Sequence, residues 1–159
     1  MFRTGIGFDV HALVTDRPMI IGGVQISHTK GLLGHSDADV LVHAVMDAIL
    51  GALALGDIGQ HFPDTDSEFH GANSLELLNH VRDLASEKGF ECTNVDSIII
   101  AEKPKMDPHI VKMRTNLASA LKITVEQVSI KATTTERLGF IGREEGIAAQ
   151  AVVLLNYIN

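Results

Sequence analysis

The chain has 159 residues, of which 45% are hydrophobic and 21% are charged, and its formal net charge is −7. These values are ordinary for a globular protein with one hydrophobic core, so we expect residues 1–159 to form a single domain. The negative charge without a basic stripe argues against a nucleic-acid partner. The longest mostly apolar stretch, residues 40–55, is too short and too polar to cross a membrane. A single cysteine, Cys92, and the lack of a signal-peptide pattern predict a cytoplasmic protein.

The N-terminal part of the chain predicts two extended segments. Residues 3–11 predict a strand, and residues 18–26 predict extended chain with a bend at its two adjacent glycines. Because successive strand side chains point to opposite faces, Asp9 and His11 lie on the same face of the first strand. One carboxylate oxygen and one imidazole nitrogen can therefore converge on a single point.

The next segment predicts a helix that begins near Ser36 and ends at Gly56. Ser36 is a good N-cap, and Asp39, at the third helical position, can complete a capping box with it. Apolar residues at helical spacing form the expected buried stripe, namely Leu41, Ala44, Val45, Ala48, Ile49, Ala52 and Leu53.

After a polar loop at residues 59–71, helices and strands alternate. A second helix is predicted from Asn73 to just before Gly89, and a third begins at Asp107, with Pro108 in its first turn. Three further strands are predicted, at residues 95–101, 128–133 and 147–155. This pattern predicts an α+β fold, an α/β sandwich of one mixed four-stranded sheet with helices packed on one face, plus a short β-hairpin.

His43 lies on one edge of the first predicted helix, four residues before Asp47 and four after Asp39. As a third ligand beside Asp9 and His11 it would complete a zinc site with an open fourth position, which is the catalytic pattern. In that interpretation a carboxylate, from Asp47 or Asp39, orients the imidazole. The alternative is a row of solvated surface residues, and spacing alone does not choose between the two.

Several loops carry groups that suit an anionic ligand. His35 and Ser36 precede the first predicted helix, where free backbone N–H groups and the helix dipole favour an anion. Residues 62–66 are rich in turn formers and predict either an ordinary surface turn or a lid with hydroxyl and amide donors. Residues 101–108 join a strand end to a helix start, the edge where ligands gather in α/β proteins, or form a rigid connection with two solvated lysines.

Residues 131–146 form the most unusual stretch of the sequence. Three consecutive threonines leave a predicted strand and offer hydroxyl and N–H donors in a small space. Glu136 suits a hard divalent ion, and Arg143 suits forked contacts to a phosphate or a carboxylate. An ordinary strand end explains one or two of these residues but not the whole stretch.

Taken together, these segments resemble the 2-C-methyl-D-erythritol 2,4-cyclodiphosphate synthase family of the non-mevalonate isoprenoid pathway. The similarity spans nearly the whole chain in the family order. The segments that carry it are residues 7–11, 31–39, 56–59, 62–66, 104–106, 131–136, 139–140 and 142–143. The departures are Asp107, where the family commonly has an apolar residue, and Glu144, where a small residue is common.

The resemblance implies a homotrimeric lyase with active sites between adjacent subunits. The implied reaction converts 4-diphosphocytidyl-2-C-methyl-D-erythritol 2-phosphate to the cyclic diphosphate and CMP, by attack of the 2-phosphate on the β-phosphorus. The implied catalytic residues are His35 and Thr134. The implied ligands of Zn²⁺ are Asp9, His11 and His43. A second ion, Mg²⁺ or Mn²⁺, would be held by Glu136 and the substrate diphosphate.

The resemblance also implies the substrate contacts. The erythritol part would meet Asp57, Ile58 and Gly59, under a flexible loop of Phe62, Pro63, Asp64, Thr65 and Asp66. The cytidine pocket of the neighbouring subunit would use Ala101, Pro104, Lys105, Met106, Asp107, Ala132, Thr133 and Thr134. The remaining implied substrate-binding residues are Asp9, His11, His35, Ser36, Thr135 and Glu136. Phe140 and Arg143 would lie near the trimer axis, where some relatives hold an isoprenoid diphosphate.

Three other functions compete with this interpretation. A zinc hydrolase would use a metal-bound water and give linear products from the same substrate. A trimeric isoprenoid-diphosphate binding protein with a structural metal would bind ligand without releasing CMP. A zinc nucleoside deaminase is disfavoured because the sequence has no C-x-x-C pair.

Overall fold

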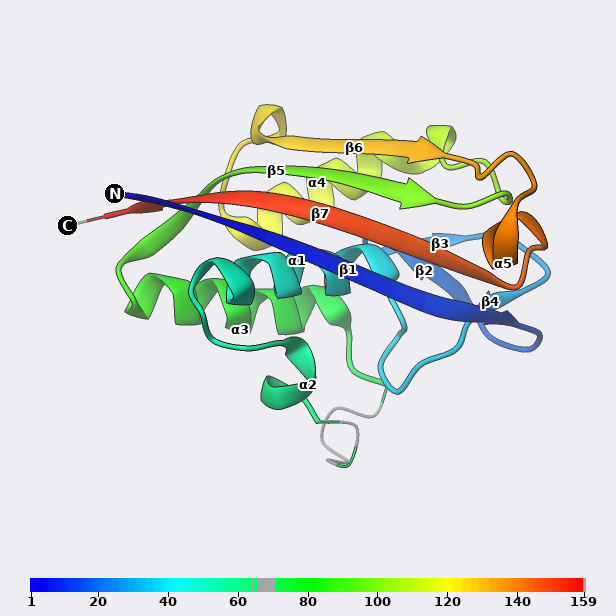
Figure 1. Cartoon of the computed structure of the whole chain (residues 1–159), viewed down its shortest axis with the longest axis horizontal. Helices are drawn as coiled ribbons and strands as arrows, with labels where there is room; N and C mark the ends of the chain where they lie inside the picture. Colours follow the sequence, from blue (N-terminus) through cyan, green and yellow to red (C-terminus); the bar gives the residue numbers. More distant parts are fainter. Residues whose placement is uncertain (64, 66–70, 159) are drawn as a thin grey trace.

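The computed structural model describes residues 1–63, 65 and 71–158 (Figure 1). A five-stranded sheet has the order β4-β1-β7-β5-β6, and its strands are antiparallel except for the parallel pair β5 and β6. The strands are β1 (Phe2–Val14), β4 (Gly31–Leu32), β5 (Phe90–Ile100), β6 (Val128–Thr133) and β7 (Gly146–Tyr157). A separate hairpin is formed by β2 (Met19–Ile21) and β3 (Val24–Ile26).

The predicted mixed sheet and the hairpin are confirmed, whereas the count of four sheet strands is wrong. The additional strand is β4, only two residues long, which pairs with the end of β1 through Leu13 with Leu32 and Val14 with Gly31. Its two residues show no alternation that the sequence pattern could reveal, because a strand needs about four residues to display a period of two.

The helices are α1 (Val40–Ala52), α2 (Ile58–His61), α3 (Ser74–Glu87), α4 (Ile110–Leu121) and α5 (Gly139–Gly142), with short 3₁₀ turns η2 (Asp107–His109) and η3 (Val125–Gln127). Helix α1 contacts β1 and β7, α3 contacts α1 and β5, and α4 contacts β6 (Figure 1). Two short helices, α2 and α5, form where the sequence predicted loops. None of the helices in the described ranges is long and apolar enough to span a bilayer.

Helices cover one face of the sheet, as predicted. Gly5, Val153, Val95 and Val128 are cross-strand neighbours and therefore share that face. Val153, Val95 and Val128 are buried there beneath the helices. On the opposite face, the alternate side chains are exposed and largely apolar, among them Phe2, Ile6, Phe8, Val10 and Val152.

Two glycines let β1 lie directly against α1. A Cβ atom built on Gly5 would come within 1.9 Å of the carbonyl oxygen of Ala48, and one built on Gly7 within 1.9 Å of that of Ala44. The next two residues on this face of β1 are Asp9 and His11. The two glycines thus keep the backbone of β1 in contact with α1 directly before Asp9 and His11.

The start of α1 differs from the predicted capping box. Its N-cap is Asp39 rather than Ser36, and the Asp39 carboxylate accepts the N–H of Val42 at 3.1 Å. The same carboxylate accepts the N–H groups of Gly22 and Gly23 at 2.9 and 2.7 Å. These long-range bonds from the hairpin explain why the buried Asp39, rather than Ser36, is the N-cap.

Other predicted helix boundaries are confirmed or corrected. Asn73 caps α3 as predicted, with its side chain accepting the N–H of Leu75 at 3.0 Å. Helix α1 ends at Ala52, earlier than the predicted Gly56, because Ala54 already adopts a left-handed conformation (φ 56°). Asp107 is not a cap: it lies inside η2, ahead of α4.

Candidate functional site

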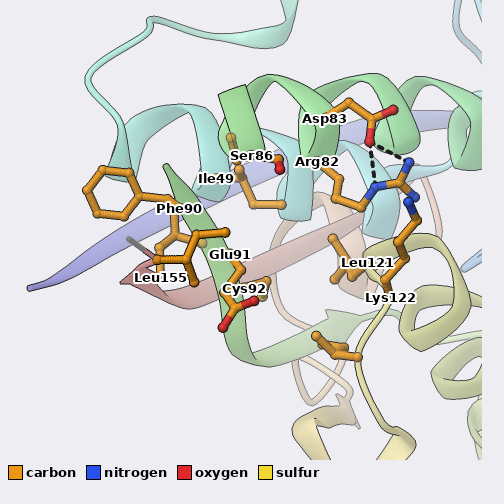
Figure 2. A pocket seen from close by; sticks show the side chains of 13 residues that line it. Ile49, Arg82, Asp83, Ser86, Phe90, Glu91, Cys92, Leu121, Lys122 and Leu155 are labelled. Atoms are coloured by element: carbon orange, nitrogen blue, oxygen red, sulfur yellow. Dashed lines mark hydrogen bonds and ion pairs between the residues drawn. The ribbon is translucent and has the colours of Figure 1, made fainter. Parts of the chain in front are cut away.

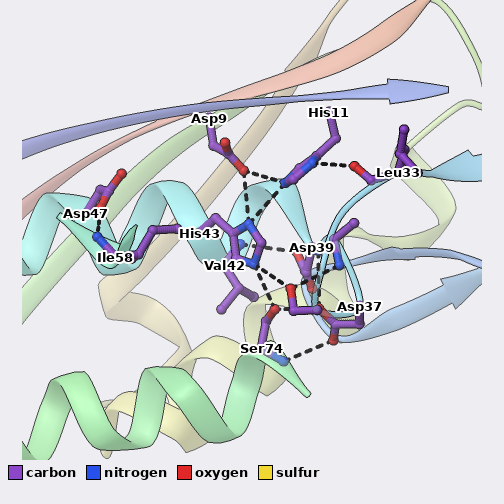
Figure 3. A network of polar contacts seen from close by, with 12 residues as sticks. Asp9, His11, Leu33, Asp37, Asp39, Val42, His43, Asp47, Ile58 and Ser74 are labelled. Atoms are coloured by element: carbon purple, nitrogen blue, oxygen red, sulfur yellow. Dashed lines mark hydrogen bonds and ion pairs between the residues drawn. The ribbon is translucent and has the colours of Figure 1, made fainter. Parts of the chain in front are cut away.

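Asp9, His11 and His43 meet at one point between β1 and α1 (Figure 3). Asp9 Oδ2 lies 2.9 Å from His11 Nε2 and 3.0 Å from His43 Nδ1, and the two imidazole nitrogens lie 3.1 Å apart. One carboxylate oxygen and two imidazole nitrogens are ligands that zinc accepts, and three protein ligands leave a fourth position for substrate or water. The predicted convergence is confirmed, and this group could hold a metal ion.

Each imidazole has a hydrogen-bond partner on the side away from the convergence point. Nδ1 of His11 lies 2.7 Å from the carbonyl oxygen of Leu33, which can only accept a proton. Nε2 of His43 lies 3.0 Å from Ser74 Oγ and 3.1 Å from Ser36 Oγ. These contacts leave His11 Nε2 and His43 Nδ1 as the nitrogens that face Asp9.

The prediction that Asp39 or Asp47 orients His43 is wrong. The carboxylate of Asp39 accepts backbone N–H groups at the start of α1, and that of Asp47 accepts the N–H of Ile58 at 2.8 Å. Burial raises the pKa of Asp47, although its bond to Ile58 opposes that shift. His43 is itself buried, so the alternative of a solvated row is also wrong.

The electrostatics of the group favour an ionised carboxylate. Burial by itself raises the pKa of Asp9, but hydrogen bonds and charge interactions with His11 and His43 outweigh it and hold that pKa well below its usual value. Burial lowers the pKa of His11, yet the hydrogen bond and charge of Asp9 raise it overall. An ionised carboxylate oxygen of Asp9 therefore lies between the two imidazoles.

The convergence point opens into a cavity of about 400 Å³, the metal cavity. Its lining residues are Asp9, His11, Leu33, Gly34, His35, Ser36, His43, Met46, Ile58, Gly59, Phe62 and Leu77. Leu33, Gly34, Met46 and Leu77 were not among the predicted site residues, since small and apolar positions on a helix or in a loop do not indicate a ligand by themselves.

Other described residues predicted around the erythritol part do not line the metal cavity. Asp57 is the N-cap of α2 and accepts the N–H of Gln60 at 3.0 Å. Pro63 and Thr65 are not part of the metal-cavity lining. Asp64 and Asp66 lie outside the described residues.

A second cavity, of about 230 Å³, lies where the parallel strands β5 and β6 end; we call it the β5–β6 cavity. It is lined by Ala101, Glu102, Pro104, Lys105, Met106, Asp107, Ala132, Thr133 and Thr134. It shares no lining residue with the metal cavity. Carboxyl ends of parallel strands are a common place for ligands.

Glu102 lines the β5–β6 cavity within the predicted segment 101–108, but its bonds to the threonine turn were not predicted. Its carboxylate accepts the N–H groups of Arg137 and Thr135, both at 3.0 Å. The bond from Arg137 is the largest of the effects that hold the pKa of Glu102 below its usual value. Glu102 thereby connects the threonine turn to the end of β5. The residues joined are more than thirty positions apart in the sequence, so no local motif predicts this contact.

The turn after β6 places its polar side chains at the surface. Glu136 adopts a left-handed conformation (φ 53°) and lies outside the three-ligand group, with Thr134 Oγ1 donating to its carboxylate at 3.3 Å. Arg143 follows α5 and donates to both oxygens of Glu145 at 2.9 and 3.0 Å. Phe140, on α5, is exposed. One chain thus keeps these residues apart from Asp9, His11 and His43.

A third cavity, of about 160 Å³, lies among α3, the start of β5 and the end of α4 (Figure 2). The Arg82 guanidinium, which lines this cavity, donates hydrogen bonds to the Asp83 carboxylate and to the carbonyl oxygen of Ala120. The cavity's thiol, from Cys92, is buried, which raises the pKa to about 12. These groups are satisfied or unreactive, so we assign this cavity no part in the chemistry.

The fold and the metal-ligand group define a member of a known family: the chain belongs to the YgbB family, whose model matches residues 2–156. Curated relatives are 2-C-methyl-D-erythritol 2,4-cyclodiphosphate synthases, as the sequence motifs predicted. That of Desulfitobacterium hafniense is 62% identical over 98% of both chains, and that of Clostridioides difficile is 60% identical over 96% of this chain and 95% of its own.

Solved structures agree with this assignment. A Plasmodium falciparum IspF, described as a CDP complex, is 35% identical with a TM-score of 0.88, and the similarity covers 99% of this chain and 97% of that one. The bifunctional IspDF of Campylobacter jejuni is 48% identical with a TM-score of 0.96 over all of this chain, which spans 43% of that longer protein. The predicted family and α+β fold are therefore confirmed.

Proposed function

We propose that this chain is a cyclising lyase of the non-mevalonate isoprenoid pathway. It converts 4-diphosphocytidyl-2-C-methyl-D-erythritol 2-phosphate to 2-C-methyl-D-erythritol 2,4-cyclodiphosphate and CMP. Its curated relatives carry the name of this synthase at 60% identity and above. The observation that carries the proposal within the molecule is the meeting of Asp9, His11 and His43 at the mouth of a cavity.

The three ligands fit Zn²⁺, and the fit rests on the chemistry of the donors. Each imidazole turns one nitrogen toward the ionised carboxylate of Asp9, and that nitrogen gives up its proton when it binds a zinc ion. When bound, the ion supplies a Lewis acid that polarises phosphoryl oxygens. Glu136, an exposed carboxylate on the turn after β6, is our candidate for the protein ligand of a second ion, Mg²⁺ or Mn²⁺.

The chain supplies position and hydrogen bonds rather than a nucleophile. An oxygen of the substrate 2-phosphate forms a bond to the β-phosphorus, and the bond from that phosphorus to the oxygen of CMP breaks, so the electron pair leaves with CMP. Holding the two phosphates in reacting geometry makes the attack nearly unimolecular, an effect that reaches about 7–11 kcal/mol in well-oriented systems. His35, Ser36 and Thr134 would donate to the oxygens on which charge develops.

The two cavities support a site shared between subunits. The metal cavity and the β5–β6 cavity lie apart in one chain, although the proposed substrate carries its phosphates and its cytidine in a single molecule. A neighbouring subunit that presents its β5–β6 cavity to the metal cavity would join them. The relative from Plasmodium falciparum is described as a CDP complex, which fits a cytidine pocket in the β5–β6 cavity.

The uncovered sheet face supports assembly into a homotrimer. Ile6, Phe8 and Val10 alternate along β1 and are exposed, and Val152 extends the same apolar surface onto β7. Exposed apolar surface of this kind marks an interface. Light scattering at micromolar concentration should give three times the mass of the chain, and a monomer that still turns over substrate would contradict the shared site.

The remaining contacts follow from the same arrangement. Ile58, Gly59 and Phe62 line the metal cavity, and we assign them to the erythritol part. We assign Asp57 and residues 63–66 to the same part of the substrate. Phe140 and Arg143 would lie near the trimer axis, a place for an isoprenoid diphosphate.

Product analysis tests the proposal directly. The purified protein, zinc, Mg²⁺ and the substrate should release CMP and yield a cyclic diphosphate, which phosphorus NMR separates from linear phosphates. Linear products would identify a zinc hydrolase. Binding without CMP release would identify an isoprenoid-diphosphate binding protein.

A further inference from the structure

We propose that Asp37 and Ser74 are positioning residues that fix the tautomer and the orientation of the His43 imidazole. The inference deepens the proposed function, because it rests on His43 acting as a metal ligand. Asp37 lies in the loop before α1, and Ser74 is the first residue of α3. Figure 3 shows both on the side of His43 that faces away from Asp9.

A chain of hydrogen bonds runs from Asp37 through Ser74 to His43. The Ser74 hydroxyl donates to Asp37 Oδ1, and its oxygen lies 3.0 Å from Nε2 of His43. An ionised carboxylate only accepts protons, so the hydroxyl proton points to Asp37. The lone pairs of Ser74 Oγ therefore face His43 and accept Nε2–H. This direction favours the neutral tautomer with its proton on Nε2, in which Nδ1, the nitrogen that faces Asp9, can bind an ion.

Backbone N–H groups hold the Asp37 end of this chain of hydrogen bonds. Asp37 Oδ2 accepts the N–H of Ser74 at 3.0 Å, so the carboxylate holds both the main chain and the hydroxyl of that residue. Its Oδ1 also accepts the N–H of Asp39 at 3.2 Å. Ser74 is fully buried. A buried donor with a single orientation restricts rotation of the imidazole, which preorganises the ligand before an ion arrives.

His11 shows the same principle with a simpler partner. The carbonyl oxygen of Leu33 accepts from its Nδ1 and leaves Nε2 for the metal. The partner of His43 differs because a serine hydroxyl can either donate or accept, whereas a carbonyl only accepts. The direction of the His43 bond is thus set one residue further away, by Asp37. Ser36, 3.1 Å from the same nitrogen, provides a second acceptor.

The decisive variant is Asp37→Asn. With a single oxygen, the new amide cannot accept both the N–H and the hydroxyl of Ser74, and when it keeps the N–H its NH₂ group faces the Ser74 hydroxyl. That hydroxyl then donates to His43, so the proton of the imidazole moves to Nδ1 and blocks the metal-facing nitrogen. Zinc affinity of the purified protein, measured by competition with a chromogenic chelator, should fall ~10–100-fold, the range known for outer-shell partners of metal ligands.

Two further proteins make the result specific. Ser74→Ala removes the relay but leaves Ser36 as an acceptor, so its zinc affinity should fall less, by ~10-fold. Ser86→Ala, an exposed serine on the same helix, should bind zinc like the wild type. Ser74→Ala also carries the test if Asp37→Asn does not fold, because it retains the Asp37 bond to the backbone N–H.

Nitrogen NMR of the metal-free protein in alkaline buffer reads the tautomer independently of activity. The fraction of His43 protonated at Nε2 should be larger in the wild type than in Asp37→Asn, in which the proton should shift toward Nδ1. Unchanged zinc affinity and tautomer in both folded variants would overturn the positioning role. Absence of zinc binding by the wild type would instead overturn the proposed metal site, so the two failures are distinguishable.

Discussion

The metal cavity and the β5–β6 cavity differ in the groups that build them. In the metal cavity, buried or half-buried side chains from β1 and α1 converge, and each imidazole has a second partner. In the β5–β6 cavity, strand ends and loops supply the lining, and Glu102 holds the adjoining turn through backbone N–H groups. The first is therefore complete as a candidate ligand set within one chain, whereas the second would contribute to the proposed site only across a contact with another subunit.

Removal of the His43 side chain should have the largest effect, and it should act on the metal cavity and leave the β5–β6 cavity unchanged. In His43→Ala, turnover should fall to background and zinc affinity by more than ~100-fold, the upper range for outer-shell changes, because a ligand itself is lost. Metal analysis and CMP release measure both. His80→Ala, an exposed histidine on α3, should keep both properties, and a fully active, zinc-free His43→Ala protein would contradict the metal role.

Substitution of Gly7 should break the support of the metal cavity. In Gly7→Ala the new methyl group would overlap the carbonyl oxygen of Ala44, and β1 would have to move away from α1. We expect a loss of at least ~3 kcal/mol in the free energy of unfolding, the upper range for overpacked cores. Chemical denaturation measures it.

Gly51→Ala is the matched control for this substitution. Its Cβ would meet only the carbonyl oxygen of Ile6, at 3.7 Å, which is ordinary contact. Because alanine favours helix over glycine by about 1 kcal/mol, this variant should be neutral or slightly stabilising. Equal destabilisation by both substitutions would show that the close approach of β1 is unimportant.

Removal of the Thr134 hydroxyl should probe the β5–β6 cavity. Thr134→Ala should lower kcat by ~10–100-fold and weaken CMP binding less, since a donor to developing charge matters most in the transition state. Steady-state kinetics and CMP calorimetry separate these effects. A normal rate with lost CMP affinity would reassign Thr134 to the cytidine pocket.

The smallest effect is expected at Cys92, which lines neither of these two cavities. Burial raises its thiol pKa to about 12, so at pH 8 only ~1 in 10,000 molecules would carry a thiolate. Iodoacetamide should leave the folded protein unlabelled and should label it on unfolding, as mass spectrometry can show. Because the folded pKa exceeds the unfolded one, Cys92 should also lower stability as pH rises from 9 to 12. Rapid labelling of the native protein would contradict this burial.

Local patterns predicted the strand that carries Asp9 and His11, the helix that carries His43, and the N-cap of α3. They were wrong where a hydrogen bond from a distant segment sets the helix boundary. At the start of α1, Gly22 and Gly23 donate to the Asp39 carboxylate. They also missed the partners of the imidazole, because Ser74 is 31 residues from His43 in the chain.

The sequence by itself determined the family, the period-two placement of a carboxylate and an imidazole, and the helix that supplies the third ligand. Each of these depends on spacing within a few residues or on motifs read in order. Only the tertiary structure decided which side chains orient the His43 imidazole and which face of the sheet stays exposed. Hydrogen bonds between distant segments have a direction and a distance, and those exist only once the chain has folded.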